Sequence, residues 1–339
     1  MADLDDAADL AVRDSGRLLA IARAGATVRQ IASADVWSGH ADLRGDEVGS
    51  VGAVVSDLLA PAYGDALAAL STRLGAPIGV RLAVIDPRGQ FPRAADVVVI
   101  VSVNGLERPL LEALHLAAAR GSTTIVAAPE ASPVAVAAAE RHAALATFDA
   151  DDPVTAWWAG VAALVAAFSG ARALDGLADA LDEAAALLGP VVETYDNPAK
   201  QLAQLHGPLL LVAVDDDAAV AAPLLVQEIG ARSSWSVRSV DVRHGFAELL
   251  DYVDDRAADA AGDLFYDPLI DGPEGAAPTR QLVLLSGANP PAPAEEALQV
   301  AERIGTVRAV AFGPDERWSA VAQILLAQLS GTYYALAND

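Results

Sequence analysis

A short, nearly continuous run of apolar and β-branched residues most strongly limits what this chain can fold into. The run extends from Ala95 to Ser102 (ADVVVIVS). It is too short for a typical helix and lacks the alternation of a half-exposed strand, so it predicts a strand buried on both faces. Apolar residues at helical spacing follow in Glu107–Arg120, and Thr123–Ala128 reads as a second buried strand. Strand, helix and strand in this order predict parallel pairing with crossover helices.

The same alternation continues along the chain and predicts a doubly wound α/β fold. We expect two domains, 1–190 and 191–339, each a parallel sheet between two layers of helices. The boundary falls near the Gly- and Pro-containing segment from Gly189 to Pro198. Strands are expected at 50–56, 77–86, 95–102, 123–128, 144–148, 208–214, 236–241, 281–286 and 306–312. Helices are expected at 2–32, 62–74, 107–120, 133–142, 153–168, 174–188, 217–229, 246–253, 293–304 and from 316 onward, with a mobile loop at 254–278.

The charge and composition exclude several classes of partner and chemistry. The formal net charge is −24, from 46 acidic and 22 basic residues. Such a surface repels nucleic acid and anionic lipid, so neither is expected as a partner. The absence of cysteine excludes disulfides, thiolate catalysis and Cys-ligated metal sites.

The apolar segments do not predict a membrane protein. The longest strongly apolar run, Ala156 to Phe168, is shorter than the roughly 20 residues of a membrane span. The sequence opens with acidic residues and has no basic region typical of a secretory signal. We therefore expect a cytoplasmic protein.

Three segments together resemble a known family. They are Asn197-Pro198-Ala199-Lys200-Gln201-Leu202-Ala203, the strand and helix within 95–128, and Tyr334-Ala335-Leu336-Ala337-Asn338-Asp339. These features are similar to the bifunctional phosphoglucose/phosphomannose isomerases, which carry two sugar isomerase (SIS) domains. Within that family they look most like a degenerate actinobacterial branch often labelled TobH-like. The resemblance implies two SIS-like domains, a hexose 6-phosphate as ligand, no cofactor, and a homodimer with sites near the subunit interface.

The turn after the 95–102 strand is where the resemblance places the phosphate of the ligand. The family has a loop of the Ser-Gly-Asn-Thr type there, and this sequence reads Ser102-Val103-Asn104-Gly105-Leu106-Glu107. Ser102, Asn104 and Gly105 are therefore candidate substrate-binding residues, since free backbone N–H groups at such turns bind anions. Glu107 would repel a phosphate if it faced the ligand. Alternatively, Glu107 serves only the start of the following helix, where acidic residues are favourable.

Other positions depart from the pattern of the family. The segment Ser56–Pro61 does not read as a phosphate-binding loop, and Pro153 is not followed by the arginine that the family has near this point. The catalytic lysine of the family lies beyond its Tyr-Leu-Ala-Leu stretch, whereas this sequence stops at Asp339. Arg93 and Arg243 remain open as replacements for the missing cationic contact.

Glu228 and His244 are the candidate catalytic residues. Aldose–ketose isomerisation needs a base that moves a proton between adjacent carbons and a group that opens the sugar ring. The resemblance assigns these roles to Glu228 and His244, which have a similar place and separation in the family. The surrounding sequence differs, because Gly245 and Phe246 follow His244. The alternative is that Glu228 is a solvated helix residue and His244 begins a helix.

The remaining candidates favour structural roles. Asp215, Asp216 and Asp217 follow a predicted strand, where their oxygens suit a divalent cation or, more simply, the cap of the next helix. The histidines lack zinc-ligand spacing and no nucleotide-binding glycine motif occurs, so neither a metal nor a nucleotide cofactor is expected. Trp157 and Trp158 are adjacent and cannot share one helix face. We expect one of them to be buried and the other to meet a partner.

Two functions of different class follow from these residues. The first is a phosphosugar isomerase that uses Glu228 and His244. The second is a catalytically inactive SIS scaffold that senses a sugar phosphate or binds a protein partner. The altered phosphate loop and the missing arginine and lysine favour the second function.

Overall fold

The computed structural model describes residues 3–14, 16–33, 43, 48–82, 91–149, 152–242, 281–287, 307–313 and 316–338. The chain divides into two compact units. We call Met1–Asp14 together with Leu187–Asp339 unit 1, and Ser15–Ala186 unit 2. The domain boundary predicted between residues 190 and 191 stays a prediction, because compactness alone does not show that a segment folds independently.

Unit 2 is built around a parallel sheet with the strand order β2-β1-β3-β4-β5. All of its strand pairs are parallel. Every residue of β3 is buried, as expected for a strand that is covered on both faces. The strands predicted around 53, 99, 126 and 146 are confirmed, and the described part of the segment 77–86 contributes a short edge strand. The strands are β1 (Val51–Val55), β2 (Gly79–Arg81), β3 (Val97–Val101), β4 (Thr123–Pro129) and β5 (Ala144–Phe148).

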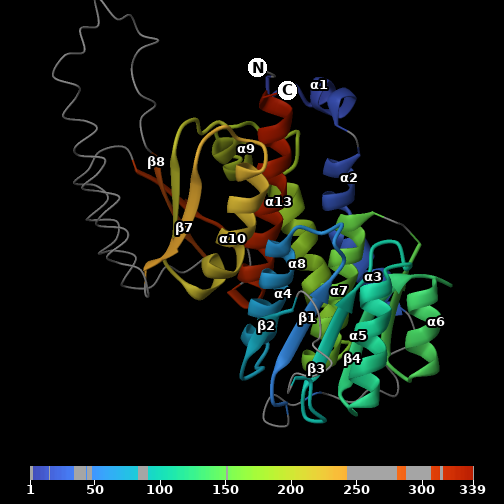
Figure 1. Ribbon diagram of the computed structural model, residues 1–339. Coiled ribbons are helices and arrows are strands. Elements are labelled where there is room, and N and C mark those ends of the chain that lie inside the picture. Colours follow the sequence, from blue (N-terminus) through green and yellow to red (C-terminus); the bar gives the residue numbers. More distant parts are fainter. Residues whose placement is uncertain are drawn as a thin grey trace, which may run out of the picture. The chain divides into compact units, whose positions relative to one another are not determined.

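Helices cover both faces of this sheet (Figure 1). One face carries α5 (Arg108–Ala119) and α6 (Pro133–Glu140), and the other carries α3 (Ala24–Ser33), α4 (Pro61–Arg73) and α7 (Pro153–Ser169). The unit also contains α8 (Ala173–Leu187). Close packing of α7 on β3 depends on Gly160, because a Cβ there would lie 2.5 Å from Cγ2 of Val101.

The N-terminal region forms three helices, so the prediction of one helix over residues 2–32 is wrong. They are α1 (Ala7–Arg13), α2 (Arg17–Ala22) and α3. Gly16 separates the first two with a φ of 91°, a left-handed conformation that glycine adopts without steric cost. The apolar periodicity alone did not reveal this break.

The expectation that only one of the two adjacent tryptophans is buried is also wrong. Trp157 and Trp158 are both fully buried in α7. The indole N–H of Trp157 donates a hydrogen bond to the carbonyl oxygen of Tyr63 (3.1 Å). Helix α7 is buried around most of its circumference, so adjacent side chains on different faces both lie in the core.

Unit 1 contains a second parallel sheet, with the strand order β7-β6-β8-β9. The strands are β6 (Leu209–Ala213), β7 (Val237–Asp241), β8 (Gln281–Ser286) and β9 (Val307–Ala311), which confirms the four strands predicted in this half. Helix α10 (Asp216–Gly230) packs against β6, β7 and β8. The predicted helices at 246–253 and 293–304 and the predicted loop at 254–278 lie outside the described residues.

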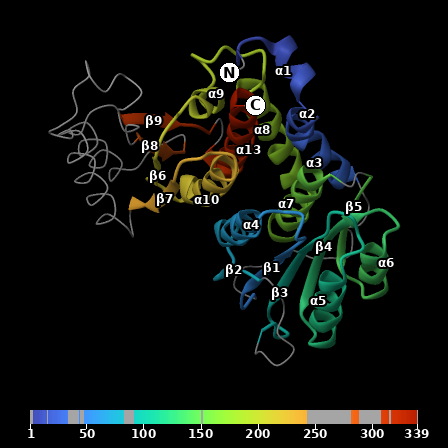
Figure 2. The ribbon, with the colours of Figure 1, turned by 45° about the horizontal axis from the view of Figure 1, so that its top comes forward.

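The C-terminal helix α13 (Ser319–Asn338) is the central helix of unit 1. It follows a short 3-10 turn, η4 (Glu316–Trp318), and packs against α10 and α9 (Pro198–Ala203) (Figure 2). Its residues from 319 to 334 are all buried, as is typical of a helix surrounded by protein. Gly331 permits close contact with α10, because a Cβ there would lie 2.5 Å from Cβ of Glu228.

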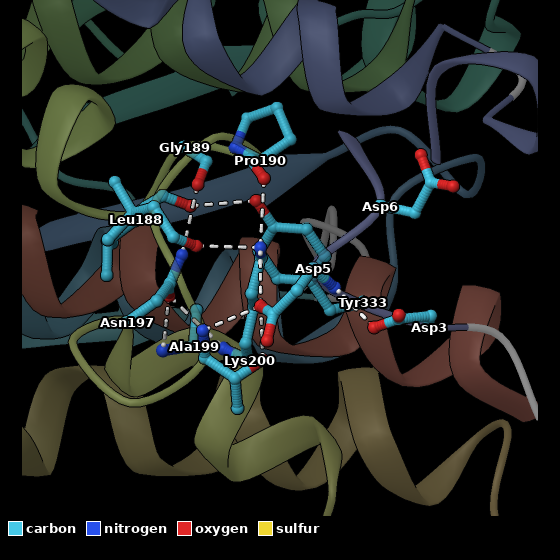
Figure 3. A network of polar contacts seen from close by, with 12 residues as sticks. Asp3, Asp5, Asp6, Leu188, Gly189, Pro190, Asn197, Ala199, Lys200 and Tyr333 are labelled. Atoms are coloured by element: carbon cyan, nitrogen blue, oxygen red, sulfur yellow. Dashed lines mark hydrogen bonds and ion pairs between the residues drawn. The ribbon is translucent and has the colours of Figure 1, made fainter. Parts of the chain in front are cut away.

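A completely buried lysine organises the segment that leads into the second sheet (Figure 3). The ammonium of Lys200 donates to the carbonyl oxygens of Pro190 (2.9 Å) and Val192 (2.7 Å), and it forms an ion pair with Asp5 (3.4 Å). These three acceptors match the three hydrogens of an ammonium group. The Asn-Pro-Ala-Lys segment that carries the family resemblance therefore has a structural role in unit 1.

Two neighbouring hydrogen bonds extend this network. Asn197 caps α9 and donates from its side chain to the carbonyl oxygen of Gly189 (3.1 Å). The hydroxyl of Tyr333 in α13 donates to the carbonyl oxygen of Leu188 (2.8 Å), as Figure 3 shows. The connection between α8 and α9 is thus held by groups on α9, on α13 and near the N-terminus.

Replacing Lys200 with methionine is expected to destabilise the protein. The carbonyl groups of Pro190 and Val192 would lose their donor, and an unsatisfied buried polar group costs about 1–3 kcal/mol. We expect the free energy of unfolding, measured by denaturant titration, to fall by at least about 2 kcal/mol. The matched control is Gln204→Met, an exposed position at the end of the same helix, which should change stability by less than about 0.5 kcal/mol. Equal stability of the two variants would contradict the structural role of Lys200.

Candidate functional site

Each sheet has one point where the strand order changes direction. In unit 2, β1 lies between β2 and β3, so the next strand in the chain pairs with one edge of β1 and the strand after it pairs with the other edge. In unit 1, β6 lies between β7 and β8 in the same way. Ligands of open α/β sheets bind outside the carboxyl ends of the strands at such points. The residues that follow β1, β3, β6 and β8 are therefore the first place to look for a site.

The structure brings the three predicted substrate-binding residues together in the turn after β3. Ser102 is fully buried, and its hydroxyl accepts a hydrogen bond from the N–H of Gly105 (2.9 Å). The side-chain oxygen of Asn104 accepts from the N–H of Leu106 (2.8 Å). Gly105 has a φ of 73°, and a Cβ there would lie 2.1 Å from Cβ of Ser132. Only glycine fits this position, and the role of the turn in binding substrate stays a prediction.

The carboxylate of Glu107 occupies the centre of this turn. It accepts hydrogen bonds from the hydroxyl of Ser102 and from the backbone N–H groups of Val103 (3.0 Å) and Asn104 (3.3 Å). Ser56, which is buried and follows β1, lies near enough to this carboxylate to help lower its pKa. Three donors at the carboxyl end of β3 thus converge on one anionic group. Successive backbone N–H groups of this kind form a typical anion-binding concavity.

Two features of this turn were not predicted from the sequence. Glu107 stands at the N-cap of α5, but its side chain makes no capping hydrogen bond to that helix and turns back to the preceding residues. Ser56, in a segment that did not read as part of a phosphate loop, contributes a buried hydroxyl. Both Ser56 and Ser102 directly follow parallel, adjacent strands, and this shared position was the signal available in the sequence.

The surroundings of Glu107 lower the pKa of its carboxyl group. Partial burial favours the neutral acid and acts in the opposite direction, but the hydrogen bonds from Ser102 and the backbone, together with the nearby Ser56 hydroxyl, favour the ionised form and outweigh it. The group at the centre of the turn is therefore an anion at neutral pH.

Of the two predicted catalytic residues, Glu228 lies near the end of α10 in unit 1, and His244 lies outside the described residues. Glu228 is buried, so the alternative of a solvated helix residue is wrong. Its carboxylate forms an ion pair with Arg232 one turn later (2.8 Å). Twelve residues of helix, about 18 Å, separate Glu228 from the start of α10 at the carboxyl end of β6.

The structure tests one of the two arginines considered as anion contacts. Arg93 precedes β3, at the amino ends of the strands, whereas the Ser102 turn follows β3. The five-residue strand between them spans about 16 Å. Arg93 is therefore poorly placed to contact an anion at this turn, and Arg243 lies outside the described residues.

A cavity of about 610 Å³ lies at another place in unit 2, beside the turn between β5 and α7. Arg17 and Arg23 from the α2 region line it, together with Asp149 and Asp152. Asp152 also caps α7 by accepting a hydrogen bond from the N–H of Thr155 (2.7 Å). None of the predicted site residues lines this cavity.

In unit 1, an aspartate bridges the corresponding strand ends. The carboxylate of Asp215 accepts from the N–H of Ala218 (2.8 Å), as an N-cap of α10, and from the N–H of Gly287 after β8 (2.6 Å). The capping interpretation is therefore confirmed for Asp215. Within the described part of the chain, no three His, Cys, Asp or Glu side chains cluster in a way that could hold a metal ion.

Comparison with known proteins supports the fold and leaves the family open. No protein-family model and no curated protein matches the sequence. Similar solved structures include a hypothetical protein from Thermus thermophilus (TM-score 0.62, 15% identity, 98% of this chain and 88% of that chain). Another is a "putative phosphosugar isomerase" from Silicibacter pomeroyi (TM-score 0.56, 16% identity, 95% and 97% covered).

A third similar structure is the C-terminal domain of glucosamine-fructose-6-phosphate aminotransferase from Francisella tularensis (TM-score 0.52, 12% identity, 96% and 97% covered). At these identities the likeness concerns the fold. The two parallel-sheet α/β units match the fold of SIS-like phosphosugar isomerases, as the sequence predicts. Among the helices of the described residues, none combines the length and apolar character of a membrane span.

Replacing Glu107 with glutamine should reduce the loss of stability in acid. The folded-state pKa of Glu107 lies below its ordinary value, so its contribution to stability is present above the unfolded-state pKa and is lost as the pH falls through the folded-state pKa. Denaturant titrations should show wild type above E107Q near neutral pH, with the gap shrinking below about pH 4.3.

The control for this experiment is Glu112→Gln. Glu112 lies on the same helix, is exposed, and pairs with Arg108 (2.7 Å). This variant should keep the pH dependence of the wild type. A constant gap between wild type and E107Q across the acid range would contradict an ionised, hydrogen-bonded Glu107.

Proposed function

We propose that this protein binds a phosphorylated carbohydrate derivative at the carboxyl ends of β1 and β3. The observation that carries the proposal is the convergence of the Ser102 hydroxyl and the Val103 and Asn104 amides on one anionic group. A phosphate group requires donors of this kind. The names of two proteins with this fold, a phosphosugar isomerase and a glucosamine-fructose-6-phosphate aminotransferase domain, support a sugar phosphate as the ligand class.

The proposed reaction, if the protein is active, is the aldose–ketose isomerisation of hexose 6-phosphates. Glu228 would move the proton between adjacent carbons, and His244 would open the sugar ring. Ser102, Asn104 and Gly105 would hold the phosphate. The same proposal includes a homodimer, a cytoplasmic location and two domains whose boundary in the sequence lies near residue 190. The family that the sequence resembles has these properties.

One observation favours the second candidate, a catalytically inactive scaffold that senses a sugar phosphate or binds a protein partner. Glu228 is buried, and its carboxylate is paired with the guanidinium of Arg232 (2.8 Å). One oxygen of the Glu228 carboxylate already accepts a hydrogen bond from this guanidinium. Proton abstraction by Glu228 would require this ion pair to open.

Binding can be tested by thermal unfolding with fructose 6-phosphate, glucose 6-phosphate and unphosphorylated glucose. A ligand that binds only the folded state stabilises it by about 2.7 kcal/mol at a hundred times its dissociation constant. We expect stabilisation by the phosphorylated sugars alone. Ser102→Ala should weaken it by about 1–3 kcal/mol, because a donor to the anion is lost.

The matched control for Ser102→Ala is Thr72→Ala. Thr72 is an exposed hydroxyl residue near the other end of α4, away from the carboxyl ends of the strands. This variant should bind as the wild type does. Equal effects of phosphorylated and unphosphorylated sugars, or no effect of either, would overturn the proposed ligand class.

Turnover separates the enzyme from the inactive scaffold. If Glu228 is the base, interconversion of fructose 6-phosphate with glucose 6-phosphate or mannose 6-phosphate should be measurable and should be lost in Glu228→Gln. The exposed Glu193→Gln, also in unit 1, is the control and should keep the activity. Binding without turnover by the wild type would support the scaffold and reject the isomerase.

A further inference from the structure

We infer that Glu107 determines which ligands bind the turn formed by residues 102–107, because its carboxylate occupies the position that the anionic group of a ligand would take. A ligand must then bring an anion that displaces Glu107 from its donors. This inference rests on the proposed function, since it concerns how the same site selects its ligand. It adds that the selecting group belongs to the protein itself.

The first argument is the number of hydrogens available in the turn. The backbone N–H groups of Val103 and Asn104 carry one hydrogen each, and so does the hydroxyl of Ser102. All three hydrogens are directed at the carboxylate of Glu107. An incoming phosphate oxygen finds these donors already in use, so it cannot bind them unless Glu107 moves away.

The second argument is electrostatic. Glu107 is ionised at neutral pH, and the whole chain already carries a net charge of −24. A phosphate placed beside this carboxylate would meet a like charge in a partly buried place, where solvent screens charges less than at the surface. Ionised Glu107 therefore disfavours phosphate binding while it stays in place. Its removal would free the three donors and eliminate the negative charge of its carboxylate.

The third argument is a contrast with the strand ends of unit 1, where Asp215 follows β6, the counterpart of β1. There the carboxylate of Asp215 caps α10 through the N–H of Ala218, so its position is explained by the helix that it begins. Glu107 also precedes a helix, but its side chain makes no capping bond to α5. Its hydrogen bonds come instead from the turn after β3. Helix capping therefore explains Asp215 and leaves the position of Glu107 unexplained.

The experiment measures the affinity of inorganic phosphate and of glucose 6-phosphate for wild type, E107S and E107Q by titration calorimetry. The serine variant removes both the charge and the competing acceptor, and we expect it to bind inorganic phosphate at least tenfold more tightly than the wild type. The glutamine variant removes only the charge and should show a smaller gain. Glu112→Ser, on the same helix, removes the same single charge outside the turn and should show no gain.

The outcomes distinguish the inference from the proposed function. A gain in E107S that Ser102→Ala abolishes, with no hexose phosphate bound by the wild type, would support the inference and overturn the proposed function of the natural protein. Binding by the wild type with no gain in folded E107S would overturn the inference and leave the proposed function standing. If E107S does not fold, an unchanged affinity in E107Q overturns the inference. If neither variant folds, Glu107 is a structural residue and the inference is overturned as well.

Discussion

The ammonium of Lys200, buried without any contact with solvent, is the constraint on which unit 1 depends. Removing a charge from water carries a large free-energy cost, so such a group persists only where partners replace its hydration. Lys200 obtains them from two backbone carbonyls and from Asp5. The path of the chain from residue 188 to residue 200 is therefore fixed by the need to present these carbonyls to one amine. The bond from Tyr333 to Leu188 then joins this path to α13, the central helix of the unit.

The carboxyl ends of both sheets show the same use of acidic side chains. Asp215 joins the ends of β6 and β8, and Glu107 accepts hydrogen bonds from the turn after β3. Backbone N–H groups at such places need acceptors, and a ligand is only one possible source of them. A chain with a large excess of acidic residues can supply the acceptors itself. Acidic side chains of the protein thereby occupy some of the anion-binding positions that a doubly wound fold offers.

Much of the fold was predictable because buried strands have a strong local signal. Runs of β-branched and apolar residues located β3, β6 and β8 to within about two residues, and helix caps and terminal glycines bounded most helices between them. The N-terminal helices were the exception. Their apolar spacing is continuous across Gly16, so the break there depends on a left-handed backbone conformation that spacing does not report.

The candidate site was predictable only in part. Ser102, Asn104 and Gly105 were found because they share one turn after an obvious strand. The influence of Ser56 on the pKa of Glu107 was missed because these residues lie far apart in the sequence and come near each other only when β1 and β3 pair. An acidic side chain at the start of a helix can bond either to that helix or to the preceding turn. The choice between them depends on the rotamer and burial of the side chain. Sequence pattern carries little information about either.

The burial of Lys200 also affects chemical modification of the protein. It is the only lysine in the sequence, and its side chain is fully buried. The folded protein therefore presents no lysine amine to acylating reagents or to enzymes that acetylate or ubiquitinate lysine. Acylating reagents and modifying enzymes reach this amine only when the segment around residues 188–200 opens. Lysine modification of this chain would thus record local unfolding of unit 1, and the native fold is protected from it.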